Sequence, residues 1–477
     1  MDTSRIRQSV AVIAVAASLI TVDFSTADPA GNLPELGITP ESSIGPERPN
    51  IVLILTDDQR RDTLRYMPIV RRLLVRHGIT FTNGYVVNPV CCPSRTSILT
   101  GLYSHSTGVY TNHRPNGGFF AFHNDDSTIA TWLQAAGYRT GLFGKYLNQY
   151  GHDPYVPPGW DRWFATHRNG GYYDYEAISD ATVREYDSDP SSYGTTVLRD
   201  RAVSFIRRTD PSTPLFVYWA PHAPHEPATP HPSDRDAFSS LSSWRPRSYD
   251  EPDVDDKPGY VSRLPRLDLA AAAEIDRFRE RQLESLQAVD RAVRAIVQAL
   301  RETDRLHDTM IVFMSDNGML WGEHRLHGKS VPYEEAVGVP LVVRYDALSQ
   351  EPREDDHLVL NIDLAPTFAA LGGADAPEVE GRNLLPLLRA PDTRWRSEFL
   401  IEHLGEGVRA APTFCAVHTD RYVLVRYATG EEELYDLARD HLQMTNRDEW
   451  ARYVDVRMGL RSKLRRLCEP VPPGFSL

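Results

Sequence analysis

The chain has 477 residues, of which 41% are hydrophobic and 25% are charged, a composition ordinary for a globular protein. This length predicts more than one domain and is ample for a buried core. The 65 acidic and 52 basic residues give a formal net charge of −13, which argues against nucleic-acid binding because that function needs a basic face.

The first 27 residues have the features of a secretory signal peptide. Arg5 and Arg7 form a basic start, the apolar stretch VAVIAVAASLI follows, and Ser25 and Ala27 fit a small-residue cleavage site. A membrane anchor is the weaker interpretation because the stretch is short, and no later segment is apolar enough to span a bilayer. The sequence therefore predicts a secreted or periplasmic protein without stable membrane insertion. A Pro-rich and Gly-rich leader follows at 28–48.

Short apolar runs along the chain each stop at polar residues. The first, residues 51–55, is rich in β-branched side chains and precedes Asp57 and Asp58. Such a run is typical of a strand buried on both faces of a parallel sheet. The same pattern recurs in three later segments: 138–146, 214–225 and 310–318.

Helical patterns alternate with these runs. In the stretch STIATWLQAAG we expect Ser127 to cap the start of a helix and Gly137 to end it. Residues 274–302 carry apolar side chains at helical spacing. The alternation predicts an α/β fold with a mainly parallel central sheet sandwiched by helices. In such folds ligands bind beyond the carboxyl ends of the strands.

The remaining chain divides into a long connection and a distinct C-terminal region. Residues 231–270 are polar and Pro-rich, and we interpret them as a surface excursion near the site. After about residue 395 the pattern predicts antiparallel strands, with a turn at ATGEE and then a helix at about 447–466. We therefore expect a catalytic domain over 49–395 and a smaller subdomain of antiparallel sheet and helix over 396–477.

Polar side chains follow two of the predicted strands. Asp57 and Asp58 come after the first strand, and Asp316 and Asn317 come after a later one. Three carboxylates at one sheet edge repel one another unless a cation joins them, and oxygen ligands suit calcium or magnesium. Either pair alone is better explained as a cap of a helix or turn. Taken together, the two pairs favour a hard divalent cation.

The stretch NPVCCPSRTSILTG contains adjacent cysteines, Cys91 and Cys92. Pro93 suits the first turn of a helix, whose start presents free N–H groups to an anion, and Arg95 adds a planar cation suited to an oxyanion. A buried structural cysteine is the commoner outcome. A disulfide between neighbours would be strained, and no C-x-x-C spacing supports zinc. Two further cysteines are free to pair in an oxidising compartment: Cys415 and Cys468.

The same stretch matches the sulfatase signature C-x-P-S-R followed by L-T-G. On this motif the chain resembles the formylglycine-dependent sulfatase family, of the alkaline-phosphatase-like superfamily. Further matching motifs are LILTDDQ, GKY, PHAPHEP, SDNG, GKSVPYEEAVGVPL and ELYDL. The pair CC, with GKYLNQYG, is most similar to the branch that contains N-acetylglucosamine-6-sulfatases and heparan-sulfate endosulfatases. The resemblance implies a sulfuric ester hydrolase that acts on a sulfated sugar or an aryl sulfate.

The resemblance also implies the cofactors. In that family the first cysteine of the motif, here Cys91, is oxidised to formylglycine (3-oxoalanine) by a formylglycine-generating enzyme. One hydroxyl of the hydrated aldehyde attacks sulfur, and the second then expels sulfate. Calcium, with magnesium as the less favoured alternative, would lower the pKa of the attacking hydroxyl. The expected metal ligands are Asp57, Asp58, Cys91, Asp316 and Asn317.

Cations and a histidine complete the implied machinery. Arg95, Lys145 and Lys329 would hold the sulfate oxygens. His225, in PHEP, would give its proton to the leaving alcohol, with His222 as the weaker choice.

One position departs from the family pattern. Many sulfatases have a histidine two residues after the GK lysine, where this chain has Leu147 followed by Asn148. The base for sulfate release is therefore open: His324 or His327 is a candidate, and either is equally well explained as a surface histidine. The residues expected to contact substrate are Lys145, Lys329, Asn112, His113 and His324.

Two other functions stay open. A phosphonate monoester hydrolase or phosphodiesterase of the same superfamily would share the formylglycine and much of the metal site. A catalytically silent binder of sulfated glycans is disfavoured by the complete set of metal and sulfate residues.

Overall fold

The computed structural model describes residues 48–151, 154–167, 171–348, 351–407 and 410–477. The predicted signal peptide and all of the predicted leader except Arg48 lie outside these residues. The described residues fall within one compact unit, so the expected domain boundary at residue 395 stays a prediction.

The largest element is a ten-stranded sheet with the order β13-β2-β12-β9-β1-β8-β4-β5-β6-β7. Its centre is parallel, which confirms the expected mainly parallel core. Every residue of the first strand is buried, as its apolar β-branched composition predicts. The parallel strands are β9 (Thr309–Ser315), β1 (Asn50–Thr56), β8 (Leu215–Ala220), β4 (Arg139–Gly144) and β5 (Arg162–Thr166).

Antiparallel strands flank this centre. On one side β12 (Leu341–Tyr345) pairs antiparallel with β9 and with β2 (Ile79–Phe81), while β13 (Arg353–Asp355) is parallel to β2. On the other side β6 (Tyr175–Ser179) and β7 (Thr182–Tyr186) form a hairpin. The sequence did not predict this hairpin, because β7 is largely exposed and carries no apolar run.

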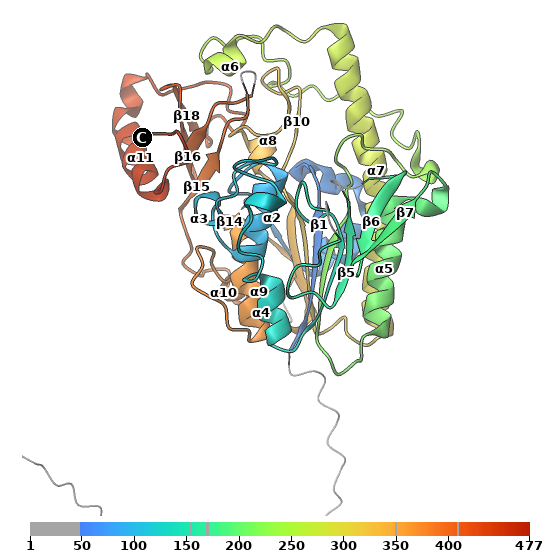
Figure 1. The fold of residues 1–477 in the computed structure, drawn as a ribbon. Helices are drawn as coiled ribbons and strands as arrows, with labels where there is room; N and C mark the ends of the chain where they lie inside the picture. The colour runs from blue at the N-terminus through green and yellow to red at the C-terminus, as the bar shows by residue number, and fades with distance from the viewer. Residues whose placement is uncertain (1–47, 152–153, 168–170, 349–350, 408–409) are drawn as a thin grey trace, which may run out of the picture. The chain divides into compact units, whose positions relative to one another are not determined.

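Helices cover both faces of the sheet (Figure 1). Val52 and Ile54 of β1 belong to one core, and the alternate residues of β1 belong to the other. The first core includes α1 (Pro68–Leu73), α5 (Gly194–Arg208) and α7 (Leu269–Glu302). The second includes α2 (Cys91–Thr100), α4 (Ile129–Ala135), α9 (Leu364–Gly372) and α10 (Leu385–Arg389).

Two helix predictions can be compared with the observed ends. The helix expected over 274–302 is confirmed and begins earlier, where the Asp268 carboxylate accepts from the Ala271 N–H. The cap expected at Ser127 is wrong: a capping box formed by Thr128 and Thr131 starts α4.

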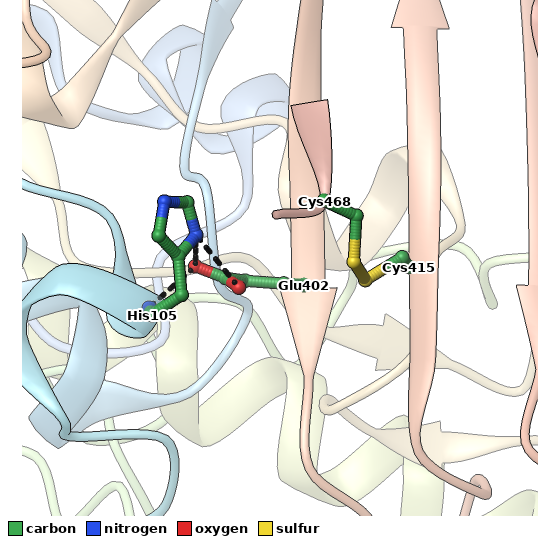
Figure 2. The surroundings of a disulfide bond; sticks show 4 residues. All are labelled: His105, Glu402, Cys415 and Cys468. Carbon is green, nitrogen blue, oxygen red and sulfur yellow. Dashed lines mark hydrogen bonds and ion pairs between the residues drawn. A yellow bond between two sulfur atoms is a disulfide. The ribbon is translucent and has the colours of Figure 1, made fainter. Parts of the chain in front are cut away.

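The C-terminal region contains a four-stranded antiparallel sheet and a helix, as expected. The helix begins at Val454, later than predicted, because a 3-10 turn over Ala451–Tyr453 precedes it. The Cys415–Cys468 disulfide joins the sheet to the residue that follows the helix (Figure 2). The elements are β15 (Glu398–His403), β16 (Phe414–Thr419), β17 (Tyr422–Tyr427), β18 (Glu432–Asp436) and α11 (Val454–Leu467).

Short elements connect these parts, and none of the described helices is both long and apolar enough to cross a bilayer. The connection 231–270 is only partly a surface excursion, because Glu251, Val254 and Lys257 are buried. The short elements are β3 (Gly84–Tyr85), β14 (Val359–Leu360), β10 (Leu320–Trp321), β11 (His327–Gly328), α3 (Ser104–Thr107), α6 (Gly259–Ser262) and α8 (Glu334–Val337).

Candidate active site

The carboxyl ends of the parallel strands bring one group of polar residues together. Asp57 and Asp58 follow β1, Lys145 follows β4, and Asp316 follows β9. The connections are direct: Lys145 Nζ donates to Asp57 Oδ2 at 2.6 Å, and the Asp58 N–H donates to Asp316 Oδ1 at 3.2 Å. We call the whole group the Cys91 cluster: Asp57, Asp58, Cys91, Arg95, Lys145, His225, Asp316, Asn317 and Lys329.

Cys91 is the first residue of α2 and has no exposed surface. Its sulfur lies 3.4 Å from Asp57 Oδ1 and 2.6 Å from Lys329 Nζ. Lys329 also contacts the Asp58 carboxylate, and its side chain is 15% exposed. The lysine therefore lies between the thiol and the surface.

Arg95, one turn further along α2, is completely buried. Its Nε donates to Asp316 Oδ2 at 2.7 Å, and Nη1 donates to the Lys145 carbonyl at 2.8 Å. Nη2 lies 3.7 Å from Asp57 and has no hydrogen-bond partner among the described residues. In this structure the guanidinium orients carboxylates, and one N–H group remains for a further acceptor.

Opposite charges are matched within the cluster: three carboxylates face two lysines and one arginine. Burial opposes ionisation of Asp57, but the charges of Lys145 and its neighbours hold the pKa of Asp57 well below its ordinary value. Burial and the neighbouring Asp57 charge raise the pKa of Asp316. Burial likewise raises the pKa of the Cys91 thiol, so the unmodified cysteine is a poor nucleophile.

Two histidines from the loop after β8 border the cluster. His222 Nε2 and His225 Nδ1 both donate to the Glu226 carbonyl, at 3.2 and 2.7 Å. His225 therefore turns Nε2 toward Asp58, 3.6 Å away, and its side chain is 28% exposed. Burial lowers the pKa of His222 to about 3, which leaves that ring neutral and makes it the poorer proton donor.

The start of α2 differs from the expected anion site. Pro93 has no N–H, and the Cys92 N–H already donates to Asn112 Oδ1 at 2.9 Å. Few free N–H groups therefore remain for an anion, and the lysines supply the positive charge. Asn112 contacts the first turn of α2, while its neighbour His113 is exposed and lies 3.9 Å from Glu406.

The candidates for the missing base have other surroundings. His324 is buried, with Nδ1 2.6 Å from Glu251 and its ring stacked on Tyr333. His327 is exposed and packs edge-on against Phe278. Among the described residues, neither histidine forms a hydrogen bond or ion pair with Cys91, so the geometry gives no support to a role for either as the base.

The donor atoms of the Cys91 cluster fit a metal ion. One donor atom each from Asp57, Asp58, Cys91 and His225 lies within 4.8 Å of the others. Asn317 Nδ2 donates to Asp58 Oδ1 at 2.7 Å, so the amide borders the same place. With an oxygen in place of the sulfur at position 91, most donors would be oxygens, as a hard cation requires.

Sequence reasoning missed a buried network behind Lys329. Tyr333, four residues after that lysine, donates to Glu433 Oε1 at 2.9 Å, and Tyr427 and Tyr435 donate to the same carboxylate at 2.5 and 2.6 Å. Glu433 belongs to β18, so the C-terminal sheet holds the segment that carries Lys329. The motif GKSVPYEE contained Tyr333, but no local pattern pointed to its distant partner.

A second missed contact joins the C-terminal sheet to the segment after α2. His105 Nδ1 lies 3.1 Å from Glu402 Oε1 (Figure 2). The other ring nitrogen, Nε2, lies 3.1 Å from Glu380 Oε1. Burial opposes protonation of His105, but hydrogen bonds from its ring to Glu380 and Glu402 raise the pKa of His105 to about 10. Both sides of the Cys91 region are thus held by the C-terminal sheet.

The carboxyl edge of the parallel-centred sheet thus brings carboxylates and cations into one buried cluster, in an α/β fold with helices on both faces of the sheet. The chain belongs to the sulfatase family: the model described as "Sulfatase" matches residues 49–374. A second, described as "N-sulphoglucosamine sulphohydrolase, C-terminal", matches residues 322–469.

Individual proteins are similar over most of the chain. The "Extracellular sulfatase SULF-1 homolog" of Drosophila melanogaster is 35% identical over 75% of this chain, which spans only 33% of that protein. The "N-acetylglucosamine-6-sulfatase" of Homo sapiens is 33% identical over 78% of this chain and 70% of its own length.

Among solved structures, BT4656 in complex with its substrate D-glucosamine-2-N,6-O-disulfate has a TM-score of 0.78. The match covers 90% of this chain and 99% of that one at 23% identity. At that identity the likeness shows the fold alone.

Proposed function

We propose that this protein hydrolyses sulfate esters of glycosaminoglycan-type sugars at the Cys91 cluster. The observation that carries the proposal is the position of Cys91. The chain belongs to the sulfatase family, and the first cysteine of the signature lies beside the Asp57 and Asp58 carboxylates and Lys329. Lys145 donates to the same Asp57 carboxylate. The names of the relatives, which include N-acetylglucosamine-6-sulfatases, support a sulfated amino sugar as substrate.

Two groups would complete the site. Formylglycine at position 91 would supply the nucleophilic hydroxyl. Asp57, Asp58, Asp316 and Asn317 together with that residue would hold calcium, which would lower the pKa of the hydroxyl and polarise the sulfate.

The chain's own residues then have separate tasks. Lys145 and Lys329, which already balance the carboxylates, would bind the sulfate oxygens and stabilise the charge that develops in the transition state. Arg95 would hold Asp316 and Asp57 in place. His225 is partly exposed and lies at the rim of the cluster, where Nε2 can protonate the leaving sugar oxygen.

Substrate comparison tests the activity. An aryl sulfate and an aryl phosphodiester should be assayed side by side, followed by a panel of sulfated mono- and oligosaccharides. We expect sulfate ester turnover to dominate and 6-O-sulfated glucosamine units to be preferred. Dominant phosphodiester turnover would reassign the protein to the phosphonate hydrolase function, and glycan binding without any turnover would make it a binder.

Metal analysis tests the ion. Asp57→Ala should lose the ion and the activity while the fold survives, because the strand core does not depend on one ligand. Stoichiometric calcium in the wild type and its loss in the variant are the expected results. Stoichiometric zinc, with activity lost only to a zinc-selective chelator, would contradict the assignment.

We further propose that the protein is exported, matured by an enzyme and divided into two domains. The signal-peptide pattern of residues 1–27 and the extracellular sulfatase relatives support a secreted or periplasmic location. A formylglycine-generating enzyme would act on the chain during maturation. Residues 49–395 would form the catalytic domain and residues 396–477 the C-terminal subdomain.

A further inference from the structure

Basic residues are concentrated in two segments of an otherwise acidic chain. The helix α11 has five basic residues and one acidic residue, and the segment 382–396 has four arginines and one aspartate. Net charges of +4 and +3 thus occur in a chain whose total is −13. Such a local reversal attracts anionic partners to one place on the surface.

The two segments meet at a pocket of about 380 Å³. We call it the basic pocket; its lining residues include Arg382, Arg394, Trp395, Arg396 and Arg466. The guanidinium of Arg382 lies 5.8 Å from the centre of the Trp395 ring, and that of Arg396 lies 5.1 Å from it. An aromatic ring beside two cations forms a wall that offers both an apolar surface and positive charge.

The acidic residues nearby do not neutralise this pocket. Arg396 is paired with the buried Asp363, and Glu398 contacts both Lys463 and Arg466. In the described part of the chain Arg382 and Arg394 have no ion pair, and both are exposed. Basic residues in the last turn of α11 are explained by the helix dipole, but Arg382 and Arg394 belong to no such turn.

We propose that the basic pocket is an exosite that binds sulfate groups of a sulfated glycan away from the Cys91 cluster. Guanidinium groups bind sulfate oxygens in a bidentate manner, and a sulfated polysaccharide presents many such groups along one chain. Trp395 offers its ring to the apolar face of a sugar. This inference rests on the proposed function, because it adds a second contact for the same class of substrate.

The pocket lies at the far end of α2 from Cys91. Gly381, beside Arg382, donates its N–H to Gly101, the residue that ends α2, while Cys91 begins the same helix. Ten helical residues separate the two ends by about 15 Å. A single sugar cannot reach both places, so the exosite acts only on extended substrates.

Binding can be measured without turnover in the Cys91→Ala protein, with a heparin-derived octasaccharide as the probe. Adding Arg382→Ala and Arg394→Ala should weaken its binding about tenfold, as expected for two lost charge-assisted contacts at an exposed site. The matched control is Arg71→Ala with Arg72→Ala, two exposed arginines on α1, which makes the same change of net charge. Equal weakening by both pairs would overturn the exosite. Equally tight binding of single-stranded DNA of matched charge would overturn its assignment to sulfated glycans.

Kinetics give a second readout in the active enzyme. The Arg382→Ala, Arg394→Ala protein should lose about tenfold in kcat/KM on the polysaccharide and keep its rate on a small aryl sulfate. Arg382→Lys with Arg394→Lys should retain most of the polysaccharide activity. Loss on both substrates would overturn the proposal. If the wild type cleaves no sulfate ester, the proposed function fails, and the octasaccharide measurement still decides the exosite.

Discussion

Buried carboxylates have different partners in the two sheets. At the carboxyl edge of the ten-stranded sheet, Asp57 and Asp58 contact lysines and a cysteine. In the four-stranded sheet, the Glu433 carboxylate accepts hydrogen bonds from three tyrosine hydroxyls, and burial raises the pKa of Glu433 against the effect of those hydrogen bonds.

The difference separates two tasks. Matched opposite charges can rearrange when an anion or a cation enters, because each group finds a new partner of the right sign. A carboxylate enclosed by three hydroxyls has one satisfied arrangement, and any change leaves a buried polar group unpaired. The matched charges around Asp57 and Asp58 therefore suit a site that binds substrate and metal. The hydrogen bonds around Glu433 suit a structural role, because they hold a neighbouring segment in one position.

The largest expected effect is at Cys91. Cys91→Ala should lower turnover at least ~1000-fold, as removal of a nucleophile does, without loss of fold. Cys92→Ala should keep the activity, because Cys92 belongs to the apolar core beneath α2. Peptide mass spectrometry of active enzyme checks the assignment, and an aldehyde at Cys92 with an intact thiol at Cys91 would contradict it.

His225→Ala distinguishes protonation from sulfate binding. A sugar alkoxide is a poor leaving group, so kcat/KM on a sugar sulfate should fall by about 10² to 10⁴. An activated nitrophenyl sulfate needs little protonation and should be affected far less. The test is to measure kcat/KM on both substrates in the wild type and the variant. Equal losses of kcat/KM on the two substrates would mean that His225 only positions the sulfate.

Two of the tyrosines that bond Glu433 can be compared as variants of the same size and chemistry. Tyr333→Phe and Tyr435→Phe each remove one hydroxyl from the same carboxylate, and each should cost about 1–3 kcal/mol of unfolding free energy. Only Tyr333 belongs to the segment of Lys329, so only Tyr333→Phe should also lower kcat. Denaturant unfolding and steady-state kinetics check this, and equal kcat values in the two variants would show that the network has no positioning role.

The smallest effect concerns pH. The folded-state pKa of His105, about 10, lies above its ordinary value near 6.5. The pairs with Glu380 and Glu402 therefore contribute fully to stability below about pH 6.5, and their contribution declines as pH rises toward 10. His105→Gln should flatten the fall of Tm across that window, and an unchanged slope would contradict the role of these pairs.

The parallel core and the strand-end residues of the Cys91 cluster could be predicted because both follow from local patterns, whereas Lys329 was expected only from the resemblance to sulfatases. An apolar β-branched run predicts a buried strand, and polar residues at its end predict a shared edge. The edge hairpin β6–β7 was not predicted, because β7 has no apolar β-branched run. The structural roles of Glu433 and Glu402 could not be predicted, because their hydrogen-bond partners lie 100 and 297 residues away in the sequence and no periodicity indicates such pairs.

The Cys415–Cys468 disulfide spans 53 residues and encloses the turn between β17 and β18, where Ala428, Thr429 and Gly430 are exposed. A protease that cuts this turn divides the chain, but the covalent bridge keeps both pieces together. The cleaved protein should migrate as one band on a gel without reductant and as two bands after reduction. A preparation cleaved at this turn is therefore indistinguishable from intact protein on a gel unless a thiol reductant is added.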